Sequence, residues 1–393
     1  MTFDRFQGGA RLAGLSAGVG VLALGLTGIG VAFDVQRALL SYLTAFVYWL
    51  GIALGALILL MAFHAAGARW PVVLRRMLEV IPLSLPLFLV LFIPIAAGMK
   101  RIFPWADASP LAGEEQRLWE HRRLFLNVPF FLVRAAFYFG VWIAVSHLLH
   151  AWSVRQDETG EIGLTLRQRR LGAGALPLVA LTMTFAAIDW IMSLQSHIAS
   201  TIFGVYYFAG SFLAALAVLI VAAQLSRGRP ELFGHHLRSS HWHSLGKFLL
   251  AFVAFWAYIA FCQFLLTWIA NLPEEVPWYL ARSRDGWMPV AVALALGQFA
   301  VPFFVLLDQD LKKRPPLLAA VAVWILVFHY LDIYWLVMPR LAQGSPAPSW
   351  TDLTAFVGVG GVSVAFTVWR LRGTVPVPVR DPYLEDSLRY EPE

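Results

Sequence analysis

The chain has 393 residues, of which 59% are hydrophobic and only 14% charged, and its formal net charge is +6. A water-soluble domain of this size cannot bury so much apolar surface, so the composition excludes an ordinary soluble protein and predicts a membrane protein. The single cysteine, Cys262, excludes cysteine-ligated iron–sulfur clusters and intrachain disulfides within this chain. The basic residues fall in short loops between apolar stretches, so the positive charge indicates membrane orientation and no nucleic-acid partner.

Apolar stretches that are long enough to cross a bilayer as helices recur along the whole chain. The first follows Arg5 and Arg11 but is long for a signal peptide and lacks a small-residue cleavage site, so we expect a retained helix. The expected fold class is therefore all-α, a polytopic membrane protein with about ten transmembrane helices. The predicted spans are 12–33, 39–66, 77–99, 126–150, 173–194, 201–226, 245–271, 287–309, 315–338 and 351–371.

The loops between these spans differ in charge. Lysine and arginine are about twice as frequent on the side that carries both termini as on the other side. The basic loops at 67–76, 153–170, 226–243 and 312–316 all fall on the termini side. Because positively charged loops stay in the cytoplasm, both termini are predicted to be cytoplasmic.

A faint internal repeat predicts the domain organisation. The string VYWLG at 47–51 resembles VYYFAG at 205–210, and the helix end that begins at Asp189 resembles the one that begins at Asp332. Matching elements lie four spans apart and point the same way across the membrane, as parallel repeats do. We therefore expect two four-helix bundles, residues 39–194 and 195–339. Residues 1–38 form an N-terminal flanking helix, and residues 340–393 form a C-terminal flanking helix and a cytoplasmic tail.

Arg134, Asp189, His329 and Asp332 are ionisable residues that each lie inside a long apolar run. A charge at the bilayer centre costs roughly 2.5–3.5 kcal/mol even on lenient scales, so such residues usually pair or line a path for protons, ions or a polar ligand. A rise of about 1.5 Å per residue places all four in the outer half of the membrane. They are interpreted as a proton relay or ligand pocket in which Arg134 keeps carboxylates ionised. The alternative is a structural ion pair between helices.

A second polar set lies near the cytoplasmic side. It consists of His64, His147 and Asp308, with His150 close by. These side chains are candidates for a proton uptake path, or they are simply residues at the membrane surface. The loop histidines His235, His236, His241 and His243 are expected to be solvated, and no metal site is predicted in this chain.

Several stretches between residues 187 and 339 resemble a known family. They are IDWIMSL at 188–194 with His197, STIFGVY at 200–206, FAGSF at 208–212, ANLPEE at 270–275, and the segment from His329 to Pro339. These stretches resemble the ActF-like membrane subunit of alternative complex III, a bacterial quinol:cytochrome c oxidoreductase whose large membrane subunits are similar to the polysulfide reductase membrane subunit (NrfD family).

The resemblance implies a subunit of the bacterial inner membrane with no redox cofactor of its own. It implies as partners a sister NrfD-like membrane subunit, an iron–sulfur subunit, cytochrome c subunits that hold haem c, and in some assemblies a terminal oxidase. The matching motifs include Asp189, His197, His329 and Asp332, so the resemblance implies a role in proton conduction for them. Arg134 lies outside these motifs and is included only because of its predicted depth in the membrane.

Three alternatives to proton conduction stay open. In the first, the same outer-half pocket binds a quinol, with Trp190 or Tyr334 beside the ring and His329 or Asp189 as proton acceptor. In the second, the chain is a standalone ion or solute transporter; matching spans lack paired mid-span Gly or Pro interruptions, which makes this less favoured. In the third, it is a passive scaffold for the cofactor-bearing subunits.

Overall fold

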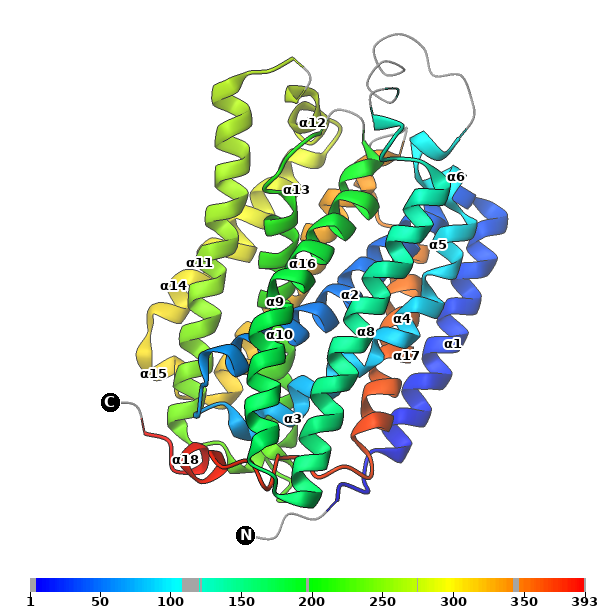
Figure 1. Cartoon of the computed structure of the whole chain (residues 1–393). Helices are drawn as coiled ribbons and strands as arrows, with labels where there is room; N and C mark the ends of the chain where they lie inside the picture. The colour runs from blue at the N-terminus through cyan, green and yellow to red at the C-terminus, as the bar shows by residue number, and fades with distance from the viewer. Residues whose placement is uncertain are drawn as a thin grey trace.

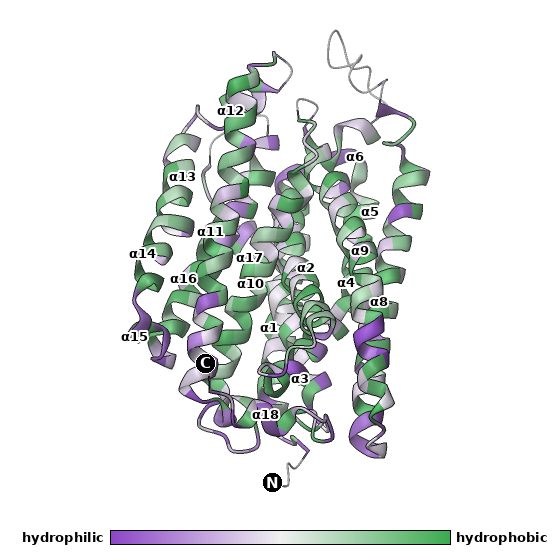
Figure 2. Cartoon of the chain, turned by 60° about the vertical axis from the view of Figure 1, so that its left-hand side comes forward, coloured by the Kyte–Doolittle hydropathy of each residue, from purple (hydrophilic) through white to green (hydrophobic). Residues whose placement is uncertain are grey.

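The computed structural model describes residues 5–107, 120, 122–195, 198–273, 275–341 and 346–391. All regular structure in this part of the chain is helical. Ten helical stretches are long and apolar enough to cross a membrane, and their bounds agree with the predicted spans to within about ten residues. Figure 2 shows apolar residues along the long helices and hydrophilic residues gathered toward their ends. The prediction of an all-α, multi-pass membrane protein is confirmed.

Seven of these stretches are single long helices. A short helix, α18 (Leu384–Leu388), lies in the C-terminal segment that follows the last of them. The long helices are α1 (Ala10–Phe33), α2 (Val35–Ala66), α8 (Val128–Thr159), α9 (Gly163–Trp190), α10 (Phe203–Ser226), α11 (Ser239–Ala270) and α17 (Trp350–Leu371). A further one, α16 (Pro315–Val337), ends in the short turn η6 (Met338–Arg340), as α9 ends in η3 (Met192–Leu194). Short elements η4 (Phe233–His236), α12 (Val276–Ala281) and α15 (Gln309–Lys312) lie in the connections.

The third and eighth spans are interrupted helices. The third consists of α3 (Val72–Val80), η1 (Ile81–Ser84), α4 (Leu85–Leu91) and α5 (Ile93–Ala97), followed by α6 (Met99–Ile102) and η2 (Pro104–Ala106). The eighth consists of α13 (Trp287–Leu294), the π-helical turn η5 (Ala295–Ala300) and α14 (Val301–Leu307). Pro82, Pro86, Pro94 and Pro302 stand at these breaks. Proline has no N–H to donate along the helix and collides with the preceding turn, so each of these residues interrupts the regular ladder.

Helix α2 lies at the centre of the molecule (Figure 1) and is buried along most of its length. It packs against α9, α10, α16 and α17, while α10 also packs against α9, α11 and α16, and α1 packs on α17. A Cβ added to Gly55 of α2 would lie 2.9 Å from the Cβ of Ala215 in α10, so this contact is close. The helices of the two predicted bundles therefore meet along α2 and α10; the division at residue 195 stays a prediction.

Both termini lie at one end of the helix bundle, called the termini end, at the bottom of Figure 1. The C-terminal segment folds back across this end: Arg75 Nη1 lies 2.6 Å from Asp381 Oδ2, and Ser387 Oγ donates to the Trp70 carbonyl at 2.6 Å. The opposite end carries α6 and α12, and the charge asymmetry of the loops predicts that it faces away from the cytoplasm.

Candidate functional site

Asp189 lies one residue from the end of α9 and is fully buried. Arg134 of α8 binds its carboxylate in a bidentate manner, with Nε 2.9 Å from Oδ2 and Nη2 2.7 Å from Oδ1. Tyr138 Oη donates to Asp189 Oδ2 at 2.9 Å, and Arg134 Nη1 donates to the Phe125 carbonyl at 2.7 Å. Both oxygens of the carboxylate are therefore held by strong donors, which stabilises its ionised form.

Aromatic side chains surround this ion pair. The Arg134 guanidinium carbon lies 3.9 Å from the ring centre of Phe125 and 4.4 Å from that of Phe130. Trp190, predicted to flank a quinone ring, is instead packed among aromatic residues and lines neither cavity described below. Its ring contacts are Phe46, Phe92, Tyr138, Phe139 and Trp142.

Asp332 lies on α16 and is also fully buried, but its partners are neutral. Tyr206 Oη donates to Asp332 Oδ1 at 2.5 Å, and Trp256 Nε1 donates to Oδ2 at 3.1 Å. One turn earlier, His329 Nδ1 lies 3.7 Å from Asp332 Oδ2. Neither ring nitrogen of His329 has a hydrogen-bond partner among the described residues. A carboxyl and an imidazole this close can hold one proton at either group.

Glycine makes room for the His329 ring. A Cβ added to Gly210 of α10 would lie 2.8 Å from His329 Cε1. The His329 ring also lies 5.3 Å, centre to centre, from the ring of Tyr48 in α2, and the two rings are tilted by 34°. The imidazole therefore lies between the two central helices.

The four predicted residues form two clusters and not one pocket, which corrects the expectation that Arg134 sits beside both carboxylates. Within the described part of the chain, no hydrogen bond or ion pair joins the Arg134–Asp189 cluster to the His329–Asp332 cluster. The reason is the packing: α8 lies against α9, whereas α16 lies against α10 and α2. His197 lies outside the described residues.

The three residues of the predicted proton uptake path lie in different surroundings. His64 is buried near the end of α2, and its Nε2 has no hydrogen-bond partner among the described residues. His147 is half-buried, with Nδ1 2.9 Å from the Ile143 carbonyl. Asp308 is exposed and caps α15 by accepting from the Asp310 backbone N–H at 2.8 Å.

A buried charge network near the termini end was missed by the sequence analysis, which placed 67–76 in a loop. Helix α3 begins at Val72, so Arg76 lies within a span, where it pairs with Glu79 at 2.7 Å and with Asp157 of α8. Ser153 Oγ donates to Glu79 Oε1 at 2.7 Å, and His150 Nδ1 lies 3.4 Å from Glu79 Oε2. The spacing of Arg76 and Glu79, three residues apart on one helix face, was the available signal.

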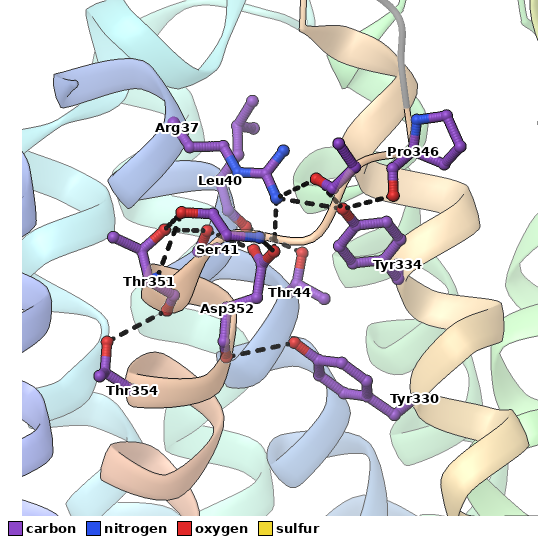
Figure 3. Close-up of polar contacts among 12 residues, drawn as sticks. Arg37, Leu40, Ser41, Thr44, Tyr330, Tyr334, Pro346, Thr351, Asp352 and Thr354 are labelled. Carbon is purple, nitrogen blue, oxygen red and sulfur yellow. Dashed lines mark hydrogen bonds and ion pairs between the residues drawn. The ribbon is translucent and has the colours of Figure 1, made fainter. Parts of the chain in front are cut away.

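Figure 3 shows a second missed network, at the opposite end. Arg37 at the start of α2 pairs with Asp352 at the start of α17, and Ser41 Oγ donates to Asp352 Oδ1 at 2.5 Å. Arg37 Nη2 also donates to Tyr334 Oη at 3.0 Å. The Tyr334 hydroxyl, predicted to lie beside a quinone, thus belongs to a network that joins α2, α16 and α17.

A cavity of about 700 Å³ lies near the opposite end, between α11, α12, α13, η5 and the end of α16. Its walls are mainly apolar and aromatic, a lining typical of small-molecule sites. Tyr206 and Trp256, the two donors to Asp332, line it, and so does Gln263, whose Oε1 has no partner among the described residues.

Arg282 also lines this cavity and was counted only as a loop residue in the sequence. Its guanidinium lies 3.6 Å from the ring centre of Trp278 and donates to the carbonyls of Trp278, Trp335 and Leu336. Burial lowers the pKa of Arg282 to about 9, so it stays charged at neutral pH. No carboxylate of the described part of the chain pairs with it.

These features define a class: a multi-pass α-helical membrane protein with two buried carboxylate clusters and a lateral cavity next to one of them. No protein-family model matches the chain, and no curated protein matches it in sequence. In the described residues, no group of three or more His, Cys, Asp or Glu side chains is placed to hold a metal ion.

Proposed function

We propose that the chain is an inner-membrane subunit of a quinol:cytochrome c oxidoreductase of the alternative complex III type, and that it conducts protons. The observation that carries the proposal is the His329–Asp332 pair. Asp332 is buried and held only by neutral donors, and the imidazole 3.7 Å away has both nitrogens free of hydrogen bonds among the described residues.

The chemistry of this pair suits proton transfer. Asp332 can be protonated without breaking an ion pair to arginine or lysine, because Tyr206 and Trp256 hold it in either state. A small side-chain rotation closes the gap to His329, which accepts the proton at Nδ1 and releases it from Nε2. Asp189, by contrast, would have to leave a bidentate arginine. We therefore assign the carrier role to Asp332 and His329, and an electrostatic role to Arg134 and Asp189.

Replacing Asp332 with asparagine tests the carrier role. Asparagine keeps the shape: its Oδ1 can accept from Trp256 Nε1 while its amide group donates to the Tyr206 hydroxyl oxygen, but it cannot carry a proton. We expect proton uptake and release coupled to quinol oxidation by the purified complex to slow roughly 10²-fold, the lower range for a lost acid–base group. The measurement is the number and rate of protons released and taken up per electron in proteoliposomes.

Asp310→Asn is the matched control, because Asp310 is exposed on α15 at the termini end. It should leave the proton stoichiometry unchanged. An assembled Asp332→Asn complex with wild-type stoichiometry and rate would contradict proton conduction through this pair and leave the scaffold interpretation. Recovery of the native chain alone, without cytochromes, would instead favour a standalone transporter.

A second candidate function, quinol binding, is favoured by the 700 Å³ cavity. An apolar cavity in the outer half of the membrane suits a lipid-soluble ring, and Tyr206 links its wall to Asp332. A quinol hydroxyl placed beside Tyr206 would then have a route for its proton to Asp332.

Filling the cavity separates this candidate from proton conduction alone. Ala260→Trp places a large ring in the cavity, so a bound quinol should be lost and the KM for quinol should rise about tenfold or more. Val327→Trp is the control, because Val327 is exposed on α16 and does not line the cavity. The quinone content of the purified complex and its KM are measured. Equal quinone content and KM in both variants would exclude quinol binding here.

A further inference from the structure

A second cavity, of about 240 Å³, lies at the termini end and shares no lining residue with the larger cavity. It is enclosed by the end of α2, the following turn, α3, the first turn of α9 and the C-terminal segment at Pro382 and Tyr383. The polar side chains that line it are those of His64, Arg69, Arg75, Thr165, Arg169 and Tyr383.

Two nitrogen atoms of this lining are buried without a partner. His64 is 5% exposed and Arg75 is 4% exposed. Among the described residues, neither His64 Nε2 nor Arg75 Nε has a hydrogen-bond acceptor or donor. Buried polar groups in folded proteins are almost always hydrogen-bonded, so two lining side chains with unsatisfied nitrogens beside one cavity point to a polar ligand there.

The charge of the lining defines the ligand further. Three arginines face the cavity and two carboxylates balance them: Arg75 pairs with Asp381 at 2.6 Å, and Arg69 pairs with Asp386 at 3.2 Å in an exposed contact. Arg169 forms no ion pair with any residue that the structure describes. Guanidinium groups and an imidazole converging on one space favour an oxyanion, and phosphate matches their geometry best.

Two exposed apolar side chains of the lining indicate where the phosphate comes from. Ile162 and Leu166, at the start of α9, line the cavity and are 70% and 48% exposed. Exposed apolar side chains beside arginines, at the end of the membrane spans, are typical of the level at which lipid headgroups lie.

We propose that this cavity binds a phosphate group, that of an anionic phospholipid in the leaflet on the termini side. The guanidinium groups of the arginines hold the phosphate oxygens, and the His64 side chain lies beside them. The acyl chains lie along Ile162 and Leu166. Free phosphate is the other source of the same chemistry. The site would tie the C-terminal segment, α2 and α9 together through one bound headgroup.

The test uses the full-length chain, purified with any subunits that accompany it. Arg169→Gln removes the arginine that has no carboxylate partner, and because Arg169 is exposed the variant is expected to fold. Arg170→Gln is the matched control: the same change on the next residue of α9, exposed, and outside the cavity lining. Phosphatidylglycerol retention after detergent washing is measured by native mass spectrometry. A separate arm titrates inorganic phosphate into lipid-stripped protein and follows Tm.

We expect wild type and Arg170→Gln to retain phosphatidylglycerol in preference to phosphatidylcholine, and Arg169→Gln to bind it about tenfold more weakly. Stabilisation by inorganic phosphate, lost in Arg169→Gln, with no lipid preference would support the phosphate site but assign it to a soluble anion. Equal lipid retention by the two variants, together with no effect of phosphate on any of the three proteins, would overturn the proposal.

Discussion

Individual side chains decide the chemistry available to this protein. The two buried carboxylates lie on comparable helix ends, yet Asp189 is fixed by a bidentate arginine whereas Asp332 accepts only from a phenol and an indole. An ion pair of the first kind restrains a carboxylate in its charged form. A carboxylate held by neutral donors can gain a proton without leaving a cation unpaired. The difference separates a structural contact from a candidate carrier.

Removing Arg134 tests this distinction. Arg134→Met leaves Asp189 buried without its cation, which should destabilise the protein by about 3–5 kcal/mol. Adding Asp189→Asn removes the unpaired charge and should restore most of the stability. Thermal unfolding of the purified complex measures both effects.

The double variant also assigns Asp189 a role. If the role of Asp189 is structural, the Arg134→Met/Asp189→Asn double variant should conduct protons at close to the wild-type rate. A stable double variant with blocked proton transfer would make Asp189 a carrier, contrary to the assignment made above. A single variant as stable as wild type would show that the ion pair contributes little to the fold.

Helix contacts decide which side chains meet. The central pair, α2 and α10, approaches closely because Gly51 and Gly55 face Ser211 and Ala215. Small residues allow such contacts in membranes, where helix association depends on packing and not on the hydrophobic effect. The same closeness brings Tyr48 of α2 and Gly210 of α10 around His329. Separation of these helices would expose the imidazole.

Gly55→Ala should therefore be destabilising. The new methyl group would collide with the Ser211 carbonyl oxygen and lie 2.9 Å from the Cβ of Ala215, closer than such atoms approach, and the overpacking should cost about 1–3 kcal/mol or more. Gly25→Ala is the matched control, because a Cβ at Gly25 meets nothing within 4 Å and alanine favours the helix by up to roughly 1 kcal/mol. The difference in Tm between the two variants measures the contact. A Gly55→Ala protein as stable as Gly25→Ala would mean that α2 and α10 are less tightly packed than described.

Each end of the molecule has its own buried charge network and its own cavity. The opposite end holds the Arg37–Asp352 network, the larger cavity and the two carboxylate clusters, while the termini end holds the Arg76–Glu79–Asp157 network and the smaller cavity. The C-terminal segment covers the termini end through Arg75–Asp381 and Ser387. His64 lies near the end of α2, whereas His329 of α16 contacts Tyr48 much earlier on α2, so a proton route that used both histidines would have to bridge this separation.

Hydropathy alone predicted the ten spans and the burial of Arg134, Asp189, His329 and Asp332. A stretch of about 20 apolar residues is stable in a bilayer only as a helix, and a charge within it is costly enough to require a partner. Arg75 and Arg76 were placed in a loop, and the partners of Glu79 were missed, because charges at the end of a span look the same in sequence whether they are solvated or paired.

The sequence by itself determined local properties: which segments form helices and which charged residues lie within the membrane. Both follow from the free energy of transferring each segment out of water. Only the tertiary structure decided that, among the described residues, Arg134 pairs with Asp189 and not with Asp332, that Tyr206 and Trp256 hold Asp332, and where the two cavities described above lie. Those outcomes depend on which helix faces pack together. In a membrane, where every helix exterior is apolar, that choice comes from close-packed small residues and a few polar contacts between segments far apart in the chain.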